Sequence, residues 1–142
     1  MAAILLHRDI RDIDAATEHI EEAVDRVPNN ADYQYLLGGA YGQTAQSAGI
    51  FRQALLAPKI KKAFARAVEL NPDHVEARVA LSQYYLMAPG IMGGDDEEGF
   101  RHLDEVVKRN DKRGRAVKAT MLERKNRLPE AEEQLKTLAS AY

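Results

Sequence analysis

An internal repeat constrains this chain more than any other feature of its sequence. Two tracts carry the same spacing of large and small residues: Leu37-Gly38-x-x-Tyr41 with Phe64-x-x-Ala67, and Leu81-Ser82-x-x-Tyr85 with Leu103-x-x-Val106. A unit that cannot bury its apolar face alone must stack on copies of itself. The repeat therefore predicts a stack of similar units, and such a stack usually presents a binding surface rather than an active site.

The secondary structure expected for these units is helical throughout. Alanine, leucine, glutamate, lysine and arginine dominate, and apolar residues recur at spacings of three and four. No stretch alternates with period two, so no strand is expected. The pattern predicts an all-α fold with helices at 13–27, 31–46, 59–70, 74–87 and 95–109 and a last helical pair within 113–141.

The repeated residues resemble the tetratricopeptide repeat family, whose unit is a 34-residue helix–turn–helix. The resemblance covers residues 10–141 and implies a right-handed solenoid of helical hairpins in a single domain, 1–142. It divides the chain into a partial repeat at 1–28, a repeat at 31–72 with an insertion at 45–58, a repeat at 74–111 with an insertion at 88–94, and a repeat at 113–141. The segment from Tyr84 to Asp95 is also similar to a bacterial subgroup of the family, some members of which are exported.

The first residues match the second helix of a repeat. Ala16, Ile20, Ala23 and Pro28 fall at the family's spacing, so Met1 would lie about four residues inside a preceding first helix. Because terminal repeats need a polar cap, we expect residues upstream of Met1 in the native gene product, either a signal or a further helix. The chain as written reads as cytoplasmic, and a trimmed signal would make it periplasmic.

The two insertions fall between the helices of their repeats, on the same edge of the stack. The first is helix-compatible, so a longer helix and a loop are equal alternatives. Together the insertions carry more apolar residues than a surface edge normally shows: Ile50, Phe51, Leu55, Ile91 and Met92. They are expected either to pack on each other and close the edge, or to form a lid over a pocket or a contact patch for a second copy.

The resemblance also implies a concave groove lined by the first helix of each repeat. Carried over position by position, its lining is Asp32, Tyr35, Gly39 and Gln43 in one repeat, Glu76, Val79, Gln83 and Met87 in the next, and Arg113, Ala116, Thr120 and Arg124 in the last. Tetratricopeptide co-chaperones that clamp a C-terminal carboxylate use lysine and asparagine at places held here by Tyr35, Gly39 and Ala80. Those side chains cannot satisfy a buried carboxylate, so chaperone tails are not expected as partners.

Charge is distributed unevenly along the chain. Residues 9–32 hold eight acids and two bases, and residues 108–127 hold nine bases and two acids. One interpretation is an electric field that favours head-to-tail self-association. The other is a solvated helical surface with local ion pairs. The basic run has no aromatic residue for base stacking, so nucleic acid is not an expected partner.

Signals for chemistry are absent from the sequence. There is no cysteine and no nucleotide-binding or hydrolase motif, and the four histidines share no helical spacing, so they are expected at the surface. The run Gly93-Gly94-Asp95-Asp96-Glu97-Glu98 predicts a capped helix start, with a weak calcium site as the alternative. No apolar run approaches the roughly 20 residues that cross a bilayer, so no membrane span is expected.

These observations predict a non-catalytic module, with no cofactor and no metal, that binds a protein or peptide in the groove. One alternative is a small-ligand carrier whose enclosed pocket lies near Phe51 and Met92. The other is a self-assembling scaffold.

Overall fold

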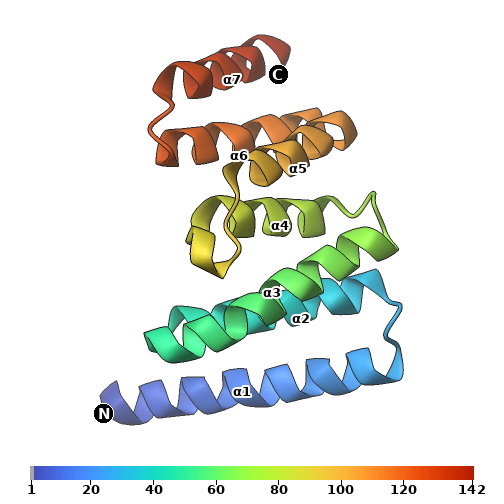
Figure 1. The fold of residues 1–142 in the computed structure, drawn as a ribbon, viewed down its shortest axis with the longest axis vertical. Coiled ribbons are helices and arrows are strands. Elements are labelled where there is room, and N and C mark those ends of the chain that lie inside the picture. Colours follow the sequence, from blue (N-terminus) through green and yellow to red (C-terminus); the bar gives the residue numbers. More distant parts are fainter. Residues whose placement is uncertain (1) are drawn as a thin grey trace. The chain divides into compact units, whose positions relative to one another are not determined.

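The structure, a computed structural model, describes residues 2–142, with side chains described from residue 12 onward. The described residues form seven α-helices and one 3₁₀ turn and contain no strand (Figure 1). They divide into two compact units, residues 1–72 and 73–142. Within each unit, helices adjacent in sequence pack against one another. The expected all-α fold of helical hairpins is confirmed.

Unit 1 contains α1 (Ala2–Arg26), α2 (Ala31–Gln46) and α3 (Ile50–Leu70), and α2 packs against both of the others. Asn30 begins α2 as predicted, because its Oδ1 accepts a hydrogen bond from the Tyr33 backbone N–H at 3.0 Å. The sequence predicted that a helix begins at residue 13, and this start is wrong because α1 begins at Ala2. Since no glycine or proline interrupts the sequence from Ala2 to Arg26, one continuous helix forms.

The first insertion extends a helix rather than forming a loop. The second helix of this repeat was expected to begin at residue 59, after Pro58, but α3 begins at Ile50 and contains Pro58. A proline inside a helix removes one hydrogen bond and costs about 3 kcal/mol. Burial of apolar side chains on both sides of it offsets that cost: Leu56, Ala57 and Ile60.

The turn between α2 and α3 is held by one side chain. Gln53 Nε2 donates to the carbonyl of Ala45 at 2.9 Å and to that of Ala48 at 3.1 Å. Ala45 lies in the last turn of α2 and Ala48 in the turn after it, so Gln53 ties the start of α3 to the end of α2. The added turns of α3 thereby start from a fixed position.

The small and large residues of the first repeat meet as predicted. A Cβ at Gly38 would lie 2.6 Å from Cδ1 of Phe64, so only glycine lets α2 approach the Phe64 ring this closely. Phe64 and Ala67 are both buried. This contact sets the packing of α2 on α3.

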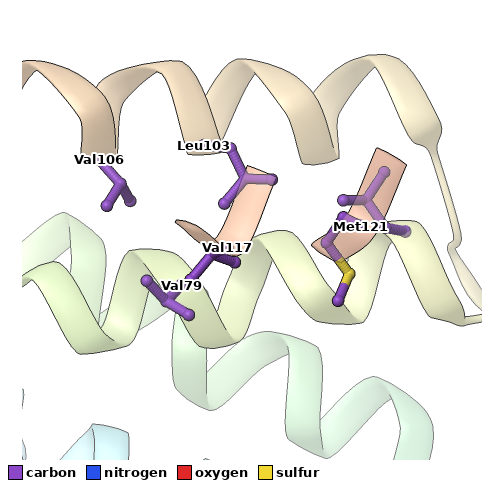
Figure 2. Close-up of a cluster of buried hydrophobic side chains, with 6 residues drawn as sticks. Val79, Leu103, Val106, Val117 and Met121 are labelled. Carbon is purple, nitrogen blue, oxygen red and sulfur yellow. The ribbon is translucent and has the colours of Figure 1, made fainter. Parts of the chain in front are cut away.

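Unit 2 contains α4 (Val75–Met87), η1 (Gly90–Met92), α5 (Asp96–Arg109), α6 (Asp111–Arg124) and α7 (Leu128–Ala141). Its core joins α4, α5 and α6. Figure 2 shows Leu103 and Val106 of α5 directed toward Val79 of α4, with Val117 and Met121 of α6 beside them. Leu103 and Val106 are both 0% exposed, so α5 contributes the most deeply buried side chains of the cluster.

The second insertion is an ordered loop. Gly93 has a left-handed φ of 90°, and a Cβ at Gly94 would lie 1.8 Å from the Ala88 carbonyl oxygen. The Tyr84 hydroxyl donates to the Met92 carbonyl, and the Asp95 N–H donates to the Tyr85 carbonyl at 2.8 Å. Both glycines are therefore required for the loop to fold back on α4.

The capped start of α5 is confirmed. The Asp95 carboxylate accepts from the Glu98 backbone N–H at 3.1 Å. The bond is half of a capping box, because the Asp95 N–H donates to the Tyr85 carbonyl instead of a Glu98 side chain. Asp96 forms an ion pair with Lys125 at 2.8 Å, which also anchors the start of α5 to the end of α6.

The third repeat begins two residues earlier than expected, at Asp111 rather than 113. Asn110 ends α5, where its N–H donates to the Val106 carbonyl at 2.7 Å, and also begins α6, where its Oδ1 accepts from the Arg113 N–H at 3.1 Å. Because one residue performs both functions, no linker is needed. This explains the short joint between the repeats.

Candidate interaction groove

An open groove runs between α1 and α2 in unit 1. It has a volume of about 570 Å³, and most of its lining is apolar. Residues at helical spacing line it from both helices: Asp12, Ile13, Ala16, Thr17 and Ile20 from α1, and Tyr35, Leu36, Gly39, Ala40 and Gln43 from α2.

Three of the four residues predicted in this repeat line the groove, namely Tyr35, Gly39 and Gln43. Asp32 is exposed in the first turn of α2 and is not part of the lining. Tyr35 packs on the Phe64 ring with a centroid distance of 6.0 Å, which fixes its position. A Cβ at Gly39 would meet no atom within 4 Å, so the groove has room for a side chain at this position.

The α1 side of the groove was not predicted from the sequence. Ala16 and Ile20 were interpreted only as packing positions of a second helix, and Ile13 was given no role. Their spacing of three and four, followed by the half-exposed Leu36 on α2, is the signal that could have identified a shared apolar lining. Such a lining accepts apolar side chains, with the carboxylate of Asp12 and the amide of Gln43 able to bind polar groups.

The predicted positions of unit 2 lie on α4 and α6. Seven of the eight are exposed or half-buried: Glu76, Gln83, Met87, Arg113, Ala116, Thr120 and Arg124. The Arg113 guanidinium donates two hydrogen bonds to the Glu76 carboxylate, each of 3.1 Å, so these faces of α4 and α6 adjoin. Val79 was predicted wrongly. It is only 3% exposed, because α5 and α6 cover it in the core.

The apolar residues of the first insertion form an exposed patch on α3. Ile50, Phe51 and Leu55 share one side of the helix, and Phe51 is 87% exposed. We call these three residues the α3 patch. In the second insertion, Ile91 is 95% exposed while Met92 is half-buried. The two insertions belong to different units, and each is exposed within its own.

The basic run at 108–127 is largely neutralised by ion pairs. Several of the carboxylates that pair with this run belong to other helices. Seven of its nine bases lie within 4.0 Å of a carboxylate: Lys108, Arg109, Arg113, Arg115, Lys118, Lys125 and Arg127. Glu105 accepts from both Arg109 and Lys108, and these hydrogen bonds lower the pKa of its carboxyl to about 2. This pattern favours the interpretation of a solvated surface with local ion pairs.

One histidine contradicts the expected surface location. His102 is 7% exposed and stacks on the Tyr85 ring at 5.8 Å. Arg78, also buried, places Nη1 3.2 Å from His102 Nδ1. Arginine has only donors, so Nδ1 accepts and the proton of the neutral ring lies on Nε2. His74 instead caps α4, His19 is exposed as expected, and the side chain of His7 lies outside the described residues.

This arrangement predicts that acid destabilises unit 2. Burial lowers the pKa of His102 below its ordinary value of 6.5, and the charges of Arg101 and Arg78 lower it further, against Glu98 and Glu105. The unfolded chain therefore binds the proton first as the pH falls. Stability is full above pH 6.5 and is lost as the pH falls through the folded pKa, by about 1.4 kcal/mol per unit of pKa difference.

Urea unfolding followed by circular dichroism between pH 7.5 and 5 tests this expectation. In His102→Gln the loss of stability over this range should shrink, because the titrating group is gone. His19→Gln, at an exposed site, should behave as the wild type does. An equal loss in His102→Gln and the wild type would show that other groups carry the acid sensitivity.

Neither a metal site nor a membrane-spanning helix is found among the described residues. No group of three or more His, Asp or Glu side chains within 12–142 is placed to hold a metal ion. Among the helices of residues 2–142, none is long and apolar enough to span a bilayer.

Comparison with known proteins gives a family match and a similar solved structure. The family model described as the tetratricopeptide repeat matches residues 1–59. Residues 1–59 are thus similar to the tetratricopeptide repeat family, whose repeats typically bind proteins. The crystal structure of MamA is similar at 16% identity and a TM-score of 0.44, over 94% of this chain and 90% of that one. A search of curated proteins finds no match.

Proposed function

We propose that the protein is a non-catalytic interaction module that binds a peptide or helix of a partner protein in the α1/α2 groove. The observation that carries the proposal is the groove itself, which is open, largely apolar and formed by packed helices. Tetratricopeptide repeats typically bind proteins, and residues 1–59, which include the groove, carry the family match.

The lining favours a segment with an apolar face. Leu36 and Ile13 offer apolar surface, and Gly39 leaves room for a side chain of the bound segment. Burial of such side chains would supply most of the binding free energy. Asp12 and Gln43 would fix the orientation of the segment through polar contacts.

The small-ligand alternative requires an enclosed pocket near Phe51 and Met92. Phe51 is 87% exposed within its unit, so it forms no wall of an enclosed pocket there. The grooves of unit 1 are open instead, which suits a polymer segment better than a small molecule.

Filling the groove at Gly39 tests the proposal. Gly39→Gln should abolish capture of peptides selected on the wild-type protein from a phage-displayed library, because the new side chain extends from the lining into the open space of the groove. The variant should not unfold, since a Cβ at this position meets nothing and glycine in a helix is about 1 kcal/mol less favourable than other residues.

Gly42→Gln is the matched control. Gly42 lies three residues further along α2, outside the groove lining, and its Cβ direction is also open. It should gain similar thermal stability and retain the selected peptides. Equal capture by Gly39→Gln and Gly42→Gln would overturn the α1/α2 groove as the binding site.

A further inference from the structure

The α3 patch lies beside a second groove of unit 1, which is formed by α1 and α3 over α2. This α1/α3 groove has a volume of about 450 Å³. Its walls are Asp14, Glu18 and Glu21 on α1 and Arg52, Leu55 and Lys59 on α3. Leu55 belongs to both the patch and the groove, so the apolar face and the acidic wall are continuous.

The acidic wall is only partly neutralised within the unit. Arg52 lies 3.3 Å from Asp14 at one end of the groove. The Tyr41 hydroxyl donates to Glu21 Oε1 at 2.7 Å, and burial together with this carboxylate raises the pKa of Tyr41 to about 12. Among the described side chains 12–142, no ion pair within 4.0 Å joins Glu18 to a base.

Unit 2 provides an internal comparison. The same three-helix arrangement, α5, α6 and α7, forms a groove of about 590 Å³. There Lys118 Nζ lies 2.8 Å from Asp104, and the Arg127 guanidinium lies 4.8 Å from the centre of the Phe100 ring. In this groove the protein's own cations neutralise the acidic wall and cover the apolar surface.

The register of the repeats identifies what unit 1 lacks. When Ile20 is aligned with Leu103, Glu21 takes the place of Asp104 and Glu18 takes the place of Arg101. Unit 1 therefore has an acid, Glu18, where unit 2 has a base, Arg101. This acid lies in the groove beside the α3 patch, whose apolar side chains are exposed within unit 1.

The two cations of the α1/α3 groove are otherwise engaged, since Arg52 pairs with Asp14 and Lys59 Nζ lies 5.6 Å from the centre of the Tyr41 ring. A partner can supply a cation for Glu18 and an apolar surface for the α3 patch.

We propose that the α3 patch and the α1/α3 groove together bind a cationic amphipathic helix of a partner protein. Its apolar side chains cover Phe51 and Leu55, and its lysine or arginine side chains enter the groove at Glu18 and Glu21. An anionic lipid surface fits less well, because the α1 carboxylates would repel it. A second copy of the chain also fits less well, because the bases of its own basic run are mostly engaged in ion pairs.

The test measures binding of a fluorescently labelled synthetic helix of leucine and lysine to the full chain by anisotropy. A leucine–glutamate helix of the same pattern is the charge control. Phe51→Gln/Leu55→Gln should weaken binding of the leucine–lysine helix at least tenfold. Glu18→Gln should weaken it several-fold and reduce its dependence on salt. Ile91→Gln, which removes an equally exposed apolar side chain from unit 2, should leave binding unchanged.

This proposal is separable from the function proposed for the α1/α2 groove, because Gly39→Gln should leave binding of the leucine–lysine helix intact. Equal binding of both synthetic helices, or unchanged binding in Phe51→Gln/Leu55→Gln, would overturn the proposal. Two other outcomes would also overturn it. In the first, the protein binds phosphatidylglycerol vesicles but neither synthetic helix, and Phe51→Gln/Leu55→Gln abolishes the vesicle binding. The other is a concentration-dependent dimer that the double substitution abolishes.

Discussion

Leu103→Ala is expected to lower the free energy of unfolding by about 2–5 kcal/mol. Leu103 is 0% exposed and lies among side chains from α4, α5 and α6 (Figure 2). Removing three carbons forfeits their burial and leaves a cavity that packed helices fill only in part. Val79 of α4 and Met121 of α6 belong to the same cluster, so removing the Leu103 side chain loosens the packing of α4 and α6 on α5.

Urea denaturation followed by circular dichroism measures this change, and Leu135→Ala is the matched control. Leu135 lies on α7 and is 46% exposed. Its truncation should change stability by less than about 1 kcal/mol. If the two substitutions cost the same, Leu103 is not packed in the core.

The packing of the repeats was predictable because it depends on local spacing. Gly38 faces Phe64 for the reason that the pattern gives, namely that a small residue admits a large one from the next helix. The range of α2 was also predicted correctly from the repeat pattern, and the structure shows that Asn30 caps its start. Features set by the spacing of the repeat could be read from the chain.

The start of α3 was not predictable from its local signal. Proline normally ends a helix, and Pro58 was interpreted in that way. Burial of Leu56 and Ile60 against the rest of unit 1 decides the outcome instead. This burial depends on where α3 packs, which a local signal does not contain.

The candidate site was predicted in part for the same reason. The α2 side follows from position within the repeat, whereas the α1 side requires knowing that α1 lies against α2. The ion-pair partners of the basic run also depend on which helices adjoin, since Arg113 pairs with Glu76 and Lys118 with Asp104 on different helices. His102 was misplaced because its partner, Arg78, is on α4 and not on α5.

Gly114→Ala should destabilise the protein, although alanine is the better helix former. A Cβ at Gly114 would lie 2.5 Å from the backbone nitrogen of Val107 and 2.6 Å from its Cα. Backbone atoms cannot rotate away, so α6 must shift from α5, at a cost of about 1–3 kcal/mol or more. This outweighs the gain of about 1 kcal/mol in helix propensity.

In the control substitution, Gly42→Ala, the change in stability should have the opposite sign. Gly42→Ala introduces the same methyl group into α2, where a Cβ meets no atom within 4 Å. Alanine there should raise the melting temperature, because only the propensity gain and the smaller entropy of the unfolded chain remain. Opposite shifts for one chemical change would show that the close contact of α5 with α6, and not the glycine itself, determines the effect. A rise in melting temperature for both would contradict that contact.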